Sequence, residues 1–102
     1  MVVLSLMYPA GARFDEDYYF NTHIPLVQDR LGARGPSDVR ILRGVSGAGG
    51  DGPAYRMVAL LTFPSTDDVE YVLTGEHSAE VLGDIANFTD GQPTVQISEV
   101  AA

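Results

Sequence analysis

The spacing of hydrophobic and polar positions along the chain predicts four strands separated by helices. An apolar run over residues 2–8 is stopped by Pro9, which is typical of a buried strand. Apolar runs over residues 39–45 and 55–63 flank a glycine-rich loop and predict an antiparallel pair. Residues 94–100 alternate with period two, as a strand with one wetter face does.

Helical spacing of apolar residues fills the two gaps between these strands. The first helix is expected over residues 16–31, with Asp15 as its N-cap and Phe14 packing onto Tyr19. Two shorter helical pieces are expected between residues 65 and 90. The element order is therefore strand, helix, strand, strand, helices, strand.

That order, βαββαβ, predicts an α+β, ferredoxin-like fold, in which helices cover only one face of a four-stranded antiparallel sheet. The chain has 102 residues, a length that suits a single domain over residues 1–102.

The strand over residues 55–63 is apolar on both sides. Val58 and Leu60 lie on one side, and Met57, Ala59, Leu61 and Phe63 on the other. Because such alternation fails where neither face meets water, we expect a homodimer in which a partner's sheet covers the free face. A chain of this size also has a small core and gains stability from a partner.

Charge and composition exclude several classes of function. Fourteen acidic residues oppose six basic ones, and the net charge of −8 repels nucleic acid and anionic lipid. Lysine and cysteine are both absent, which removes Schiff-base and thiolate chemistry. No apolar run approaches the ~20 residues of a membrane span, and no signal peptide is recognised. We expect a cytoplasmic protein without a nucleic-acid or membrane partner.

Three motifs are assigned structural roles. Residues 47–52 fit GxGxxG, but Pro53 and a strand follow where a dinucleotide site needs a helix, so a hairpin loop is expected. His77 is expected at the surface, and no paired-histidine motif predicts a metal. Four arginines are expected to neutralise nearby carboxylates rather than bind an anion: Arg30, Arg34, Arg40 and Arg43.

His23 is the first candidate for chemistry. It falls on the apolar face of the first helix although a polar face was open to it. An inward imidazole needs a partner, because a buried unsatisfied polar atom costs about 1–3 kcal/mol. It is either a core histidine tied to a tyrosine or a backbone carbonyl, or a proton shuttle in a ligand cavity. Pro25, two residues later, is expected to bend the helix there.

Other side chains complete the candidate site. Tyr8, Tyr19 and Phe63 are expected to line a cavity, although aromatic residues at such spacings also form ordinary cores. Asp84 and Asn87 share a helix face near Phe88. Asp84 is able to orient an imidazole or to act as a base, or it is a solvated helix charge.

Two segments of the chain resemble the EthD family, named for ethyl tert-butyl ether degradation. They are FDEDYYFNTHIPLV at residues 14–27 and DIANFTDGQP at residues 84–93, the latter similar to the end of short bacterial members. The resemblance implies a dimeric α+β barrel. Relatives with this barrel include cofactor-free monooxygenases, polyketide cyclases, decarboxylases and muconolactone-isomerase-like proteins. By motif position, the cavity-facing histidine of many of them is His23, and Asp84 with Asn87 occupies the second motif.

Three hypotheses about function follow. The first is a cofactor-independent enzyme that binds a small apolar or aromatic compound and uses His23 to move a proton in an isomerisation, cyclisation, decarboxylation or oxidation. The second is a non-catalytic binding or accessory protein serving an oxygenase in a degradation pathway. The third is a dimer without a ligand-sized cavity.

Overall fold

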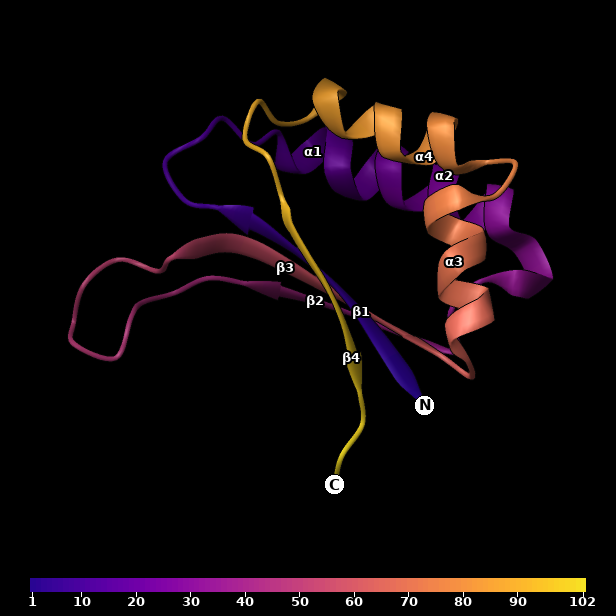
Figure 1. The fold of residues 1–102 in the computed structure, drawn as a ribbon. Helices are drawn as coiled ribbons and strands as arrows, with labels where there is room; N and C mark the ends of the chain where they lie inside the picture. Colours follow the sequence, from indigo (N-terminus) through magenta and orange to yellow (C-terminus); the bar gives the residue numbers. More distant parts are fainter.

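Four antiparallel strands form a single sheet, and all helices lie on one side of it (Figure 1). The computed structural model describes residues 1–102. The strand order is β2-β3-β1-β4, which confirms the predicted α+β, ferredoxin-like fold. The strands are β1 (Val2–Pro9), β2 (Asp38–Arg43), β3 (Tyr55–Phe63) and β4 (Thr94–Glu99).

The first helical region covers residues 16–31 as the sequence predicts, and the second lies between residues 66 and 87. Both regions are divided into pieces of different pitch, and each ends in a 3₁₀ turn. The pieces are α1 (Glu16–Tyr18), the π-helical η1 (Tyr19–His23), α2 (Ile24–Leu31), the 3₁₀ turn η2 (Gly32–Arg34), α3 (Thr66–Thr74), α4 (Ser78–Gly83) and the 3₁₀ turn η3 (Asp84–Asn87).

The N-terminus of the first helical region has the predicted N-cap and hydrophobic contact. The Asp15 carboxylate accepts a hydrogen bond of 3.1 Å from the backbone N–H of Tyr18 and so caps α1. The rings of Phe14 and Tyr19 pack with their centroids 5.1 Å apart. This contact is the hydrophobic staple expected on either side of the cap, and it fixes the direction in which the helix leaves β1.

A π turn lies directly before Pro25, the residue at which the sequence predicts a bend. The N–H of Ile24 donates to the carbonyl of Tyr19, which is the i→i+5 bond of a π-helix. Pro25 has no N–H to donate to Asn21 and therefore cannot continue a regular α-helical ladder. The wide turn moves the next residue onto the inner face, so that His23 and Ile24 both point toward the sheet.

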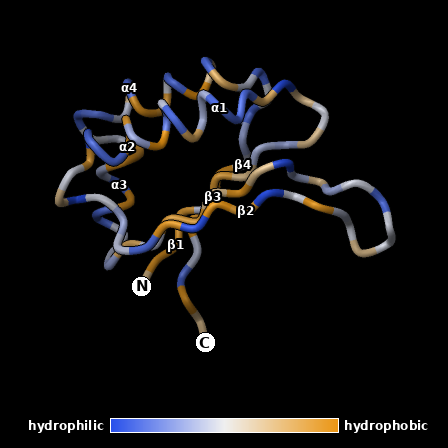
Figure 2. The backbone as a smooth tube through the Cα atoms, turned by 180° about the vertical axis from the view of Figure 1, so that it is seen from behind, coloured by the Kyte–Doolittle hydropathy of each residue, from blue (hydrophilic) through white to orange (hydrophobic).

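The sheet has an inner face, which the helices cover, and an outer face, which they do not. Leu4 pairs with Leu61 between the central strands β1 and β3, and both side chains are buried under the helices. Their sequence neighbours point to the outer face, because side chains alternate along a strand. Figure 2 shows that β1 and β3 are hydrophobic along most of their length. The outer face of the centre of the sheet is accordingly apolar and uncovered in the single chain: Val3, Met7, Leu42, Val58 and Leu60.

The core divides into two clusters. The first joins the helix α3 to one end of the sheet, and the second is an aromatic group at the other end. The first consists of Val2, Leu4, Leu31, Leu61, Phe63, Val69 and Val72. The second consists of Tyr8, Phe14, Tyr19, Met57 and Phe88. Only 16 of 102 residues are buried, so the space between the clusters is not filled by a continuous core.

The surface features follow the sequence analysis. Each of the four clustered arginines contacts a carboxylate: Arg30 with Glu80, Arg34 with Asp68, Arg40 with Asp38 and Arg43 with Glu16. The glycine-rich loop joins β2 to β3 as a hairpin. None of the helices combines the length and the apolar character needed to cross a membrane.

The aromatic cluster depends on Phe88, which is fully buried and contacts four other rings of the region within 5.5 Å, centroid to centroid. We expect Phe88→Ala to lower the free energy of unfolding by about 3–5 kcal/mol, because it leaves a cavity at the centre of the cluster. Urea unfolding measures this loss. Phe20→Ala, at a partly exposed ring, is the matched control and should cost about 1 kcal/mol or less. Equal losses in the two variants would contradict this description of the core.

Candidate functional site

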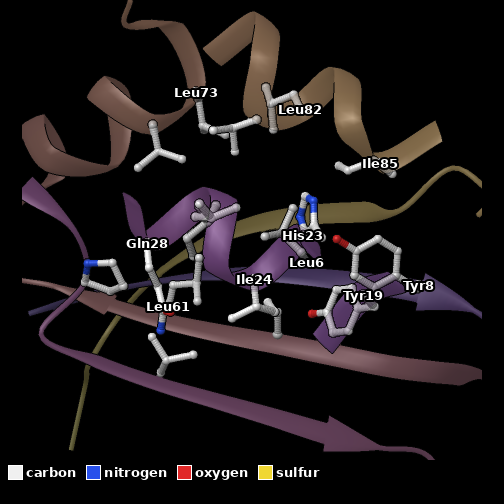
Figure 3. Close-up of a pocket in the computed structure, with 17 residues that line it drawn as sticks. Leu6, Tyr8, Tyr19, His23, Ile24, Gln28, Leu61, Leu73, Leu82 and Ile85 are labelled. Carbon is white, nitrogen blue, oxygen red and sulfur yellow. The ribbon is translucent and has the colours of Figure 1, made fainter. Parts of the chain in front are cut away.

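A cavity lies between the helices and the sheet, where the two core clusters fail to meet (Figure 3). Its volume is about 50 Å³, on a measure by which one water molecule needs about 10–15 Å³. Fourteen of its 17 lining residues are hydrophobic. The lining residues are Leu4, Leu6, Tyr8, Tyr19, His23, Ile24, Val27, Gln28, Pro36, Val39, Ala59, Leu61, Val72, Leu73, Val81, Leu82 and Ile85.

The two ends of the cavity differ in character. Gln28 and Val39 are exposed residues of the lining and mark its solvent side. Tyr8 and Tyr19 are almost fully buried and close the other end, with His23 beside them (Figure 3). A ligand that enters past Gln28 therefore meets apolar walls before it reaches His23 and the two tyrosines.

His23 is positioned by a hydrogen bond on one ring nitrogen only. It lies at the end of η1 and is 5% exposed. Its Nδ1 is 2.8 Å from Oδ2 of Asp84, whereas its Nε2 makes no hydrogen bond within the chain. The imidazole is thus fixed at one nitrogen, its other nitrogen has no partner within the chain, and the residue lines the cavity.

Asp84 is itself held by two further groups. It opens η3, where its Oδ1 accepts hydrogen bonds from the Tyr18 hydroxyl at 2.6 Å and from Nδ2 of Asn87 at 2.9 Å. Both oxygens of the carboxylate are therefore occupied by donors. This arrangement leaves Asp84 little freedom to rotate, so it orients the histidine rather than reaching the cavity, whose lining does not include it.

The electrostatics of the pair favour a carboxylate beside a neutral imidazole. Burial lowers the pKa of His23 below its usual range, and the hydrogen bond and charge of Asp84 raise it by less. Burial works to raise the pKa of Asp84, but the hydrogen bonds that it accepts outweigh burial and hold that pKa below its usual range. A carboxylate only accepts, so Nδ1 carries the proton and Nε2 presents a lone pair.

Two tyrosines form the buried end wall beside the histidine. The Tyr19 ring stacks on the His23 ring with centroids 5.7 Å apart and an interplanar angle of 17°. Tyr8 packs edge-on against Tyr19 at 5.8 Å. The Tyr19 hydroxyl is buried and has no hydrogen-bond partner. Burial raises the pKa of both phenols, so both stay protonated at neutral pH.

The structure brings most of the candidate residues together, but not all of them line the cavity. Phe63 does not: it belongs to the first core cluster, because the inner face of β3 continues past the cavity to its end. Phe88 lies behind the wall, 4.6 Å from the His23 ring centroid to centroid. Asn87 acts on Asp84 and is not part of the lining.

Sequence reasoning missed Tyr18 and Gln28. Tyr18 lies one position off the inner face of an ideal helix, and its bond to Asp84 joins segments 66 residues apart. Gln28 reaches the lining because the π turn advances the helix face by one residue. Pro25 was the only signal in the sequence for that turn.

No group of three or more histidine, cysteine, aspartate or glutamate side chains is placed to hold a metal ion. His77, the second histidine, lies at the N-cap of α4 and is 3.8 Å from the carboxylate of Glu76. His77 does not line the cavity.

Comparison with known proteins agrees with this architecture. The EthD domain matches residues 11–92. The crystal structure of an EthD-like protein from Ralstonia eutropha JMP134 is 38% identical, with a TM-score of 0.87, over 99% of this chain and 92% of that chain. An EthD family protein from Bacillus halodurans C-125 is 20% identical, with a TM-score of 0.77, over 97% of each chain.

A more distant structure, an antibiotic biosynthesis monooxygenase, is 11% identical with a TM-score of 0.59 over 100% of both chains. At that identity the likeness concerns the fold alone. Among curated proteins, no sequence matches this chain.

The pKa of His23 tests the proposed charge state of the pair. We expect an NMR titration of the His23 ring protons to give a pKa below 6.5, because burial disfavours the imidazolium. Asp84→Asn should lower that pKa further, since both contributions of Asp84 raise it. A His23 pKa above 6.5 would show that Asp84 outweighs burial and stabilises an imidazolium instead. A pKa that rises in Asp84→Asn would show that the carboxylate does not raise the pKa of His23.

Proposed function

This chain belongs to the EthD family, and we propose that it is an enzyme in which His23 transfers a proton to or from a small, largely apolar or aromatic organic compound. The observation that carries the proposal is the pair of His23 and Asp84, whose imidazole has one nitrogen without a partner and belongs to a residue that lines an apolar cavity. A core histidine needs no cavity and no carboxylate fixed by two further donors.

The pair supports general base catalysis. Asp84 holds the Nδ1–H tautomer, and the lone pair on Nε2 is then able to accept a proton from a bound compound and return it. Isomerisation, cyclisation, decarboxylation and cofactor-independent oxidation all include such a step. Because His23 supplies the base, the proton transfer itself requires no cofactor.

The lining of the cavity supports the class of ligand. Hydrophobic side chains make up most of the wall, so a polar or charged ligand would lose its hydration without replacement hydrogen bonds. A second candidate function is a non-catalytic binding or accessory protein of an oxygenase or degradation pathway. It is favoured by the small number of polar groups on the wall: His23 and Gln28 beside the two tyrosines.

We also propose that two chains associate through the outer faces of their sheets to form a dimeric α+β barrel. The support is the apolar centre of that face, with Leu42 48% exposed in the single chain. Two sheets pack face to face at about 10 Å when apolar side chains interdigitate. Polar residues surround this centre, among them Asp38, Arg40, Gln96 and Ser98, as at the rim of an interface.

Removing the imidazole tests the catalytic proposal. We expect His23→Ala to reduce turnover about 10²–10⁴-fold on any compound processed from a panel of phenols and lactones, because the base is lost. His77→Ala is the matched control and should keep wild-type rates. Ligand binding is followed in parallel by NMR shifts of the cavity methyl groups. Unchanged turnover in folded His23→Ala would remove His23 from the mechanism, and binding without turnover by the wild type would establish the accessory role instead.

The dimer is tested by a charge on the outer face. We expect the wild type to have twice the chain's 10.9 kDa mass by light scattering. Leu60→Asp should yield monomers, because an unpaired carboxylate cannot be buried between two sheets. Val45→Asp, on a loop residue that is 88% exposed, is the control and should leave the mass unchanged. A monomeric wild type, or a Leu60→Asp variant that keeps the wild-type mass, contradicts the proposal.

A further inference from the structure

The buried hydroxyl of Tyr19 is an unexplained polar group at the end of the cavity. It has no hydrogen-bond partner, although the residue is only 1% exposed. An unpaired buried hydroxyl is destabilising, and phenylalanine would fill the same space without this cost. Such an exception in an otherwise satisfied core calls for an account in terms of function.

A second phenol lies beside it. Tyr8 also lines the cavity, and its ring is 5.8 Å from the Tyr19 ring, centroid to centroid. Only the Tyr19 hydroxyl is both fully buried and without a partner. Figure 3 shows both hydroxyl oxygens directed from the aromatic end toward the middle of the cavity. Burial raises the pKa of both groups, so each remains an O–H donor at neutral pH.

The cavity end therefore presents two donors and one acceptor. The donors are the phenols, and the acceptor is Nε2 of His23, which stacks beside Tyr19. A carbonyl oxygen accepts two hydrogen bonds and donates none, so one such oxygen satisfies both phenols at once. The acceptor then faces the atoms next to that carbonyl.

We propose that the substrate is a carbonyl compound with an acidic C–H next to the carbonyl, whose oxygen binds the hydroxyls of Tyr8 and Tyr19 while Nε2 of His23 removes the proton. This inference rests on the proposed function and gives it a substrate class. Tyr8 and Tyr19 become an oxyanion hole.

The step balances without any oxidant or reductant. The C–H bond breaks and its proton moves to Nε2; the electron pair forms a C=C bond, while the carbonyl π pair moves onto oxygen as an enolate. The two phenols stabilise this oxyanion, and Asp84 stabilises the imidazolium that forms. Return of the proton to another carbon of a conjugated enolate gives an isomer, and loss of a neighbouring group gives an elimination product.

The probe for the test is pent-4-en-2-one, a slender ketone. Proton removal from C3 and its return at C5 give the conjugated pent-3-en-2-one, whose ultraviolet absorbance reports the reaction. We expect the wild type to catalyse this isomerisation, and Tyr8→Phe and Tyr19→Phe each to slow it about 10²-fold or more. Tyr71→Phe is the matched control, because its hydroxyl bonds Glu76 outside the cavity lining.

A stability measurement separates this role from a structural one. Tyr19→Phe removes only an unpaired hydroxyl, so its Tm should equal or exceed that of the wild type. A lower Tm together with unchanged isomerisation would assign the hydroxyl to the fold and overturn the inference.

The hydrocarbon 2-methylpenta-1,4-diene carries CH₂ in place of the carbonyl oxygen. Its binding distinguishes a failure of the proposed function from a failure of the carbonyl inference alone. If neither compound shifts the NMR signals of the cavity methyls and no panel compound binds, the proposed function itself fails. If both bind but the ketone is isomerised no faster than by His23→Ala, or the Tyr→Phe variants match the wild type, the carbonyl inference alone is wrong. Binding of both compounds with isomerisation that depends on both hydroxyls supports it.

Discussion

The hydrogen bond between His23 and Asp84 is the interaction on which the rest of the site depends. It joins two helical segments 61 residues apart at 2.8 Å. The bond determines which imidazole nitrogen carries the proton, and its burial on both sides keeps water from competing for either group. Tyr18 and Asn87 complete the restraint, because they leave the carboxylate no unoccupied oxygen that could turn it away from the ring. The free nitrogen is thereby fixed in both chemistry and direction.

The core of the domain is incompletely packed around this site. Two core clusters at opposite ends of the sheet leave a cavity between them, and a buried phenol without a partner lies at its end. Each feature lowers stability, since unfilled space loses dispersion contacts and an unpaired hydroxyl loses its hydration. In a chain of 102 residues, such losses are large relative to the net stability of a domain. Covering the outer face of the sheet with a second chain would offset them.

The fold could be predicted from the sequence because its signals are local. The apolar runs of β1 and β3, the cap at Asp15 and the glycine-rich hairpin each act within a few residues. The importance of His23 could be inferred in the same way, from its position on an apolar face. The π turn could not, because Pro25 is compatible with either a bend or a change of pitch. The bond from Tyr18 to Asp84 and the displacement of Phe63 from the cavity depend on tertiary packing, which no local spacing encodes.

The tautomer of His23 is the property that tests this account most directly. Nitrogen-15 chemical shifts of the imidazole ring at neutral pH distinguish a protonated from an unprotonated nitrogen at each position. We expect a neutral ring with the proton on Nδ1 and none on Nε2, in the absence of ligand. A neutral ring with its proton on Nε2, or a ring protonated at both nitrogens, would contradict it, because neither form has a lone pair to present to the cavity.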